Sequence, residues 1–243
     1  MKTPRLLIFL LLVACDGPGQ PPKPAAPEAA GADIPLMPVT KGDTWIYEVH
    51  LEIPADVTSP GAAEIDQKHR RIRTYLGKIS PARGLPEVDC MEITVPGSPV
   101  EREFVDIYAD RILMRGSMIL RDEAARPMWL EPAVPFIVAG MKPGTESEAI
   151  HAVGGSLSRK TQVVARESVT VPAGTFPSIR LLMTGTDGGV ELRRTIWFAP
   201  GIGIVREEKT RYRTGKLLFR ETQQLAQTSL KADVPGNKKR SPP

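Results

Sequence analysis

The stretch from Ser178 to Phe198, SIRLLMTGTDGGVELRRTIWF, decides the fold class because it reads as two strands joined by a short turn. On both sides of Asp187-Gly188-Gly189, residues typical of β-strands alternate in part between apolar and polar. Glycine next to aspartate is common in tight hairpin turns, since glycine readily adopts a positive φ. The stretch therefore predicts an antiparallel β-hairpin.

The same pattern extends outward along the chain. In TWIYEVHLEI (44–53), the side chains of Trp45, Tyr47, Val49 and Leu51 share one face. Further strand pairs flank Gly154-Gly155 and Thr214-Gly215, and hardly any window has the 3.6-residue period of a helix. We therefore predict an all-β domain over residues 36–230. It is an antiparallel meander of roughly ten to twelve strands, curled as a half-barrel or open barrel that protects its edges.

One segment departs from the pattern. ARPMWLEPAVPFIVAGMKPGTE (125–146) intersperses prolines among apolar residues, which excludes a central strand and a regular helix. We expect an extended loop that lays Trp129 and Phe136 over the sheet. These two residues are the candidate ligand contacts, and the alternative is that the loop simply completes the core.

The N-terminus carries a signal for export. Lys2 and Arg5 precede an apolar run of eight residues, Leu6–Val13, which is too short to span a bilayer as a helix. The run ends at Ala14-Cys15, which resembles a bacterial lipobox, in which the cysteine receives acyl chains such as palmitate. The sequence thus predicts a lipoprotein signal peptide at 1–14 with lipidation of Cys15.

A tether and a tail flank the predicted domain. Residues 15–35 are rich in Pro, Ala and Gly and predict a disordered tether that holds the domain off the membrane. Asp16 resembles a signal for retention in the inner membrane, although the choice between inner and outer membrane stays open. We expect a protein of the bacterial cell envelope that is anchored by lipid and faces the periplasm or the cell surface.

The charge pattern argues against a nucleic-acid partner. The formal net charge is +4, but the basic excess lies in the signal peptide and in the tail KADVPGNKKRSPP (231–243), which we expect to be disordered. The body between them is close to neutral and needs no basic face. The expected partners are the membrane, through the anchor, and an apolar ligand or an envelope protein.

No motif for catalysis, a cofactor or a metal is present. His50, His69 and His151 form no metal-binding spacing, and no nucleophile elbow or phosphate loop occurs. Cys90 lies among strand-forming residues and is expected to be buried and inert. The pair Glu207-Glu208 alternates across a strand, which suggests solvent exposure. We therefore predict no catalytic, cofactor or metal residues.

Three motifs carry a family resemblance. They are PVTKGDTWIY (38–47), VTVPAGTFPSIRL (169–181) and TIWFAPGIGIVREE (195–208). Together they resemble the TapB-like group of uncharacterised bacterial lipoproteins, whose sheet is similar to the half-barrel of the lipoprotein carriers LolA and LolB. The resemblance implies a fold and carries over no catalytic residues. Within the motifs, Gly174 is expected to need a positive φ, and Phe176 to fold back as an apolar plug.

Two functions of different classes follow from the sequence. The favoured one is a non-catalytic binding or scaffold role, in which the curved sheet takes an apolar ligand or a partner segment. The alternative is an envelope hydrolase whose site assembles from distant residues. A concave apolar groove would favour the first, and clustered His, Asp or Ser in a cleft would favour the second.

The lipobox interpretation is tested by Cys15→Ser. The wild-type protein should partition into detergent and carry acyl mass on Cys15, because two or three acyl chains anchor a protein stably. The variant should be released or mislocalised. A mature wild-type protein that begins at Asp16 or later without acyl mass would contradict the interpretation.

Overall fold

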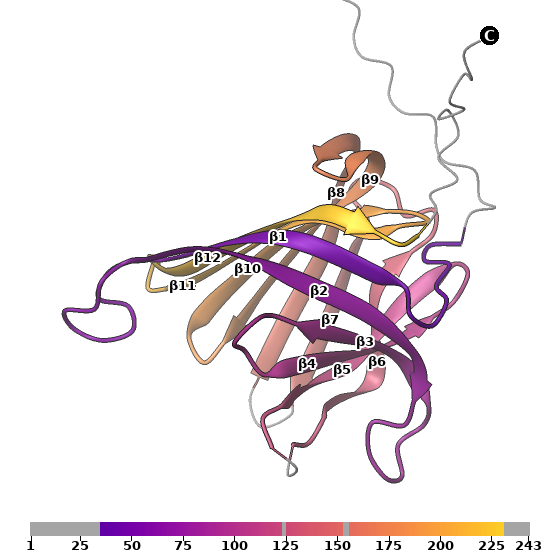
Figure 1. The fold of residues 1–243 in the computed structure, drawn as a ribbon, viewed down its shortest axis with the longest axis horizontal. Helices are drawn as coiled ribbons and strands as arrows, with labels where there is room; N and C mark the ends of the chain where they lie inside the picture. Colours follow the sequence, from indigo (N-terminus) through magenta and orange to yellow (C-terminus); the bar gives the residue numbers. More distant parts are fainter. Residues whose placement is uncertain (1–34, 123–124, 153–155, 231–243) are drawn as a thin grey trace, which may run out of the picture.

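The computed structural model describes residues 35–122, 125–152 and 156–230. These residues form one twelve-stranded antiparallel sheet in the order β6-β5-β4-β3-β2-β1-β12-β11-β10-β9-β8-β7, which curls into a nearly closed barrel (Figure 1). The strands are β1 (Thr44–Ile53), β2 (Ile65–Ile79), β3 (Val88–Thr94), β4 (Val100–Ile107), β5 (Arg111–Leu120), β6 (Met128–Val138), β7 (Glu146–Ala152), β8 (Ser156–Val171), β9 (Gly174–Asp187), β10 (Val190–Ala199), β11 (Gly203–Arg213) and β12 (Lys216–Thr228).

The predicted fold class is confirmed, and the hairpin predicted over Ser178–Phe198 forms β9–β10. Strands consecutive in sequence are also neighbours in the sheet, except β6 and β7, which form its two edges, and β1 pairs with β12. Among the described residues, no helix is both long and apolar enough to cross a membrane. The predicted signal peptide, the basic tail, Cys15 and all of the tether except Pro35 lie outside the described residues.

The proline-containing segment corrects one expectation. It is not a loop over the sheet, because Met128–Val138 forms β6, an edge strand hydrogen-bonded to β5. Pro132 and Pro135 are compatible with this position, since an edge strand needs ladder donors on one side only. The other edge is β7, and β6 and β7 approach each other without pairing.

The expected turn before Phe176 is confirmed. Gly174 has a φ of +137°, and Phe176 is buried in a cluster with Val169 and Val171. The turn between β8 and β9 also reaches across the sheet, where the Ala173 N–H donates to the Leu225 carbonyl at 3.0 Å. The hairpin tip thereby covers part of the β11–β12 region.

The two faces of the sheet carry separate apolar clusters. Residues at paired positions share a face, so the row Cys90–Phe104–Gly116–Trp129 lies opposite the row that contains Met91. The first row belongs to an outer cluster, whose buried members are Val88, Cys90, Phe104 and Met118. Cys90 is fully buried as predicted, and burial raises the pKa of its thiol to about 11.

Gly116 permits the close approach of β6 at this outer cluster. Its φ is +149°, and a Cβ atom at this position would lie 1.9 Å from the Met128 carbonyl oxygen. The Phe104 and Trp129 rings flank the glycine, with their centroids 6.4 Å apart. A side chain here would therefore separate β5 from β6 or strain the backbone.

Candidate functional site

One end of the barrel is closed by the segment that precedes β1. The Leu36 N–H donates to the Ala109 carbonyl at 3.2 Å, and the Gly201 N–H donates to the Leu36 carbonyl at 3.0 Å. The segment therefore joins the β4–β5 turn to the β10–β11 turn, and the Leu36 side chain is buried in the core. We call this the closed end, and the opposite end, with the β1–β2 and β11–β12 turns, the mouth.

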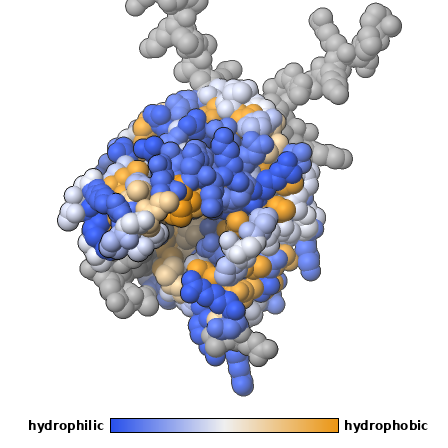
Figure 2. Space-filling view, turned by 60° about the vertical axis from the view of Figure 1, so that its left-hand side comes forward, coloured by the Kyte–Doolittle hydropathy of each residue, from blue (hydrophilic) through white to orange (hydrophobic). Residues whose placement is uncertain are grey.

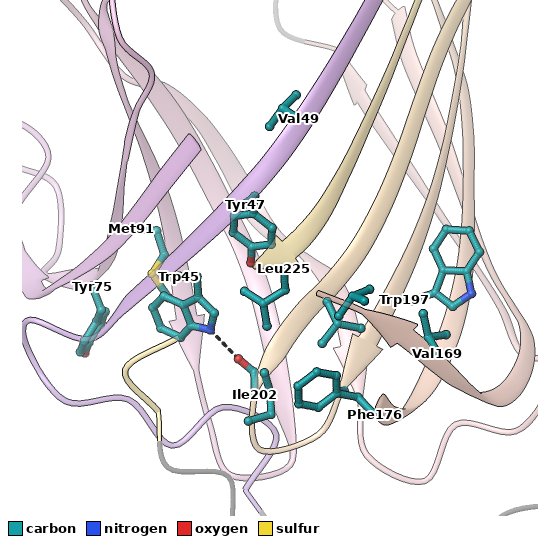
Figure 3. Close-up of a cluster of buried hydrophobic side chains, with 13 residues drawn as sticks. Trp45, Tyr47, Val49, Tyr75, Met91, Val169, Phe176, Trp197, Ile202 and Leu225 are labelled. Carbon is teal, nitrogen blue, oxygen red and sulfur yellow. Dashed lines mark hydrogen bonds between the residues drawn. The ribbon is translucent and has the colours of Figure 1, made fainter. Parts of the chain in front are cut away.

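Two aromatic residues of β1 fix the inner wall near the closed end (Figure 3). Trp45 Nε1 donates to the Ile202 carbonyl at 2.7 Å, and the Tyr47 hydroxyl donates to the Ile204 carbonyl at 2.8 Å. These bonds satisfy the polar atoms of two buried rings. They also tie β1 to the β10–β11 turn and the start of β11 across the intervening strand β12.

A cavity lies inside the barrel next to these rings. Three methionines, Met37, Met91 and Met114, line it together with apolar residues of β1, β4, β5, β6, β10 and β11. Its volume is about 40 Å³, which is room for about three water molecules. Arg73, Glu103 and Arg194 form the charged part of its wall. The cavity is thus apolar at the closed end and charged toward the mouth.

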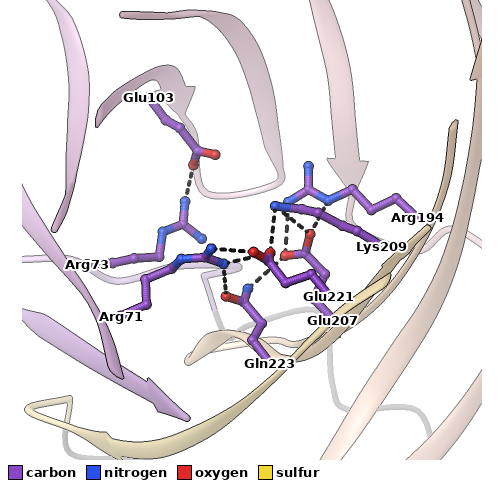
Figure 4. A network of polar contacts seen from close by, with 8 residues as sticks. All are labelled: Arg71, Arg73, Glu103, Arg194, Glu207, Lys209, Glu221 and Gln223. Atoms are coloured by element: carbon purple, nitrogen blue, oxygen red, sulfur yellow. Dashed lines mark hydrogen bonds and ion pairs between the residues drawn. The ribbon is translucent and has the colours of Figure 1, made fainter. Parts of the chain in front are cut away.

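The charged wall belongs to a larger ionic layer across the barrel interior (Figure 4). Its side chains come from β2, β4, β10, β11 and β12 and point toward one another. We define the layer by its eight members, which are Arg71, Arg73, Glu103, Arg194, Glu207, Lys209, Glu221 and Gln223.

Glu207 is the most deeply buried charge in the layer, with 2% of its side chain exposed. Its carboxylate accepts from Arg194 Nε at 2.6 Å, from Arg194 Nη2 at 3.1 Å and from Gln223 Nε2 at 2.7 Å. Burial alone would raise the pKa of Glu207. The charges of Arg194 and Lys209 outweigh burial and hold the pKa far below its usual range.

A second pair lies closer to the mouth. The Arg71 guanidinium donates to both oxygens of Glu221, at 2.9 and 2.7 Å, and to Gln223 Oε1 at 2.7 Å. Lys209 Nζ joins the two pairs, 3.3 Å from Glu207 and 3.4 Å from Glu221. The pKa of Glu221 is lowered, because these hydrogen bonds and charges outweigh the effect of burial.

Arg73 differs from the other arginines of the layer in keeping a buried donor without a partner among the described residues. Its Nη2 donates to Glu103 in a short contact, whereas its buried Nε has no hydrogen-bond partner among the described residues. Burial would raise the pKa of Glu103, but the Arg73 and Arg194 charges lower it overall. The region around Arg73 therefore stabilises negative charge.

This layer is suited to binding rather than to proton transfer. A general acid or base works best with a pKa near the operating pH. Here the carboxyl pKa values of Glu103, Glu207 and Glu221 are lowered, and the guanidinium pKa values of the arginines are raised. The groups stay charged at neutral pH and can orient a ligand by charge and hydrogen bonds.

The predicted ligand contacts are separated by the structure. Phe136 lines the cavity, and its ring packs edge-on against Phe198 with the centroids 6.2 Å apart. Trp129 instead packs against the outer cluster. Their roles in ligand binding stay predictions, and the geometry favours Phe136.

Neither of the two histidines whose side chains are described belongs to the ionic layer, although His69 lies beside Arg71 on the same face of β2. His50 Nε2 lies 2.6 Å from Asp66 Oδ1 in an exposed pair, and the side chain of His151 lies outside the description. Burial, followed by the Arg71 charge, lowers the pKa of His69. Among the described residues, no three His, Cys, Asp or Glu side chains are placed to hold a metal.

Sequence reasoning missed the ionic layer. The expectation that Glu207 is solvent-exposed was wrong, because the interior of this barrel is charged in its middle. On β2 the charged side chains of Arg71 and Arg73 face inward, while Ile72 faces outward and is 39% exposed. The available signal was the presence of opposite charges at every second position on strands that pair with one another.

The chain is only distantly similar to known proteins. No protein-family model and no curated protein matches the chain. Three solved structures resemble it, with 10–16% identity and TM-scores of 0.38–0.39 over 80–82% of this chain and 98–99% of theirs. They are a predicted lipoprotein from Parabacteroides distasonis, a predicted exported protein with a YmcC-like fold from Bacteroides fragilis, and a β-barrel-like protein of a domain of unknown function from Brucella abortus. Similarity at this level assigns no function to the chain.

The lowered pKa of Glu207 predicts a specific acid sensitivity. The folded state favours the ionised form of Glu207. The resulting stabilisation of the folded state is therefore fully present above the ordinary pKa of 4.5 and is lost as the pH falls below it. Glu207→Gln should cost about 3–5 kcal/mol at pH 7, because Arg194 loses its charged partner. The deficit should shrink between pH 6 and pH 3, measured by urea unfolding at each pH.

Glu208→Gln is the matched control for this measurement. Glu208 is the next residue, faces outward and pairs with Arg206, and its side chain is 38% exposed. The free energy of unfolding of the Glu208→Gln variant should differ from that of the wild type by less than about 1 kcal/mol. Equal deficits of the Glu207→Gln variant at every pH would contradict the assignment of Glu207 as the main buried charge.

Proposed function

We propose that this protein is a lipid-anchored protein of the bacterial cell envelope that binds an apolar ligand inside its barrel and carries out no catalysis. The observation that carries the proposal is the cavity between the closed end and the ionic layer. The signal sequence and Cys15 support the location. The resemblance to the TapB-like group of lipoproteins agrees with the proposed location and implies no activity.

The lining of the cavity supports adaptation to a ligand. Its present volume is small for a lipid chain, but methionine has several rotatable bonds and fills irregular spaces. Rotation of Met37, Met91 and Met114 would enlarge the cavity without a change in the strands. Met37 belongs to the segment that closes the barrel, so its movement does not disturb the sheet ladder.

The mouth offers a route for entry. Figure 2 shows a hollow in the surface that is bordered by apolar and hydrophilic residues. By strand register, Ile119 lies on the same face as Glu101, and Met128 lies on the same face as Glu103. Both apolar residues therefore face the barrel interior. Both apolar side chains are exposed, at 46% and 52%. Exposed apolar groups beside an opening are typical of ligand sites.

Binding is tested by titrating the purified protein with N-phenyl-1-naphthylamine, a neutral apolar probe, and following its fluorescence. We expect saturable binding to the wild type. Met114→Trp should raise the Kd about tenfold or more, because the larger ring occupies a cavity of about 40 Å³. Ile72→Trp adds the same ring on the outer face and should leave the Kd unchanged.

Trp129→Ala completes the test on the outer cluster. This variant should lower the free energy of unfolding by about 3–5 kcal/mol without changing the Kd of the probe, since Trp129 packs on the outer cluster and is not a lining residue of the cavity. No saturable binding by the folded wild type, or equal binding by the Met114→Trp variant, would overturn the proposed function.

A further inference from the structure

The position of Arg73 makes the cavity more than a generic apolar site. Its side chain lies at the boundary between the apolar cavity and the ionic layer, and only 13% of it is exposed. The strand register explains this position, since Arg73 faces inward beside Trp45 on β1 and Ile93 on β3. A ligand in the cavity would therefore have the guanidinium within its reach.

Arg73 also retains binding capacity. Arg71 and Arg194 each form two-pronged contacts with a glutamate, whereas Arg73 contacts Glu103, its one salt-bridge partner in the described part of the chain, through Nη2 alone. Its Nε lacks a partner among the residues that the structure describes. A buried donor without an acceptor is costly. An acceptor that reached Nε would remove that cost.

The local charge selects the kind of acceptor. Two guanidinium groups, Arg73 and Arg194, border the cavity with one carboxylate, Glu103. Arg194 is paired with Glu207 behind the wall, but the ionic layer as a whole holds four cations against three carboxylates. Glu101, two residues before Glu103 on the same face of β4, lies closer to the mouth and outside the cavity lining. A planar, negatively charged group matches a guanidinium in both charge and geometry. An ammonium group at the same place would add a fifth positive charge to a layer that already has an excess of cations.

We propose that the ligand is an amphiphile with an acidic headgroup, whose chain lies in the cavity and whose headgroup binds Arg73, with Arg194 adding positive charge. This inference rests on the proposed function and specifies its ligand class. Glu103 then acts as an internal competitor for Arg73. Removal of the Glu103 charge should therefore favour the ligand.

The experiment compares ligands that share one chain and differ in headgroup. Decanoate, monodecyl phosphate, 1-decanol and decylamine are titrated into the full-length protein by calorimetry at pH 7.5. Decanoate or monodecyl phosphate should bind about tenfold or more tightly than decanol, as a charge-assisted hydrogen bond predicts, and decylamine should bind most weakly. Preference for the carboxylate indicates a fatty acid, and preference for the phosphate indicates a phospholipid-like ligand.

Three variants test the role of Arg73. Glu103→Gln should tighten binding of the preferred acid at least threefold without affecting decanol, because the competing carboxylate is removed. The double variant Arg73→Met with Glu103→Gln leaves no unpaired charge at this pair and should abolish the preference for the acid. Arg70→Met is the control, since Arg70 is exposed on the outer face of the same strand. It should change nothing.

The outcomes separate the two proposals. Equal binding of acid and alcohol overturns the headgroup inference and leaves the proposed function intact. If none of the four ligands binds the folded protein and N-phenyl-1-naphthylamine also fails, the proposed function falls as well. Weaker acid binding by a folded Glu103→Gln variant would also overturn the headgroup inference, because it would make Glu103 part of the ligand site.

Discussion

Charged groups that leave water must find partners, and the ionic layer imposes this requirement on five strands at once. Its pairs bring together residues that are far apart in the sequence, such as Arg71 and Glu221. The partners meet only if each strand has the right register, because a shift by one residue turns the side chains to the other face. We infer that the layer helps to specify the register of the barrel, in addition to any contribution to stability.

The layer also divides the interior by chemistry. Toward the closed end the walls are apolar, and Trp45 and Tyr47 tie β1 to β11 through carbonyl groups. Toward the mouth the interior is charged and then open. This order places the only strongly polar surface of the cavity at one side, so that an amphiphile has one favourable orientation within the described part of the barrel.

Strand positions were accessible from the sequence because they depend on local signals. Alternation and glycine turns predicted the hairpin of β9 and β10, and Gly174 was identified by its place after Pro172-Ala173. The edge strand β6 was missed because local proline content does not reveal which side of a strand is unpaired. Edge position is a property of the whole sheet.

The site depends on information that no local pattern contains. Arg71 and Arg73 alternate with apolar residues, and the usual assumption places the apolar set inside. In this barrel both faces carry apolar clusters, and the charged set of β2 points inward. The role of Leu36 was equally hidden, because its contacts are with turns more than seventy residues away. Only the closed geometry brings these groups together.

The central claim is that the ligand occupies the space between the closed end and the ionic layer, and methyl NMR of ¹³C-methionine-labelled protein tests it directly. Met37, Met91 and Met114 line the cavity, whereas Met118 belongs to the outer cluster and Met128 is exposed near the mouth. On titration with N-phenyl-1-naphthylamine, the methyl signals of the three cavity residues should shift through the ring current of the probe, and that of Met118 should not. Shifts confined to Met118 or Met128 would contradict the account.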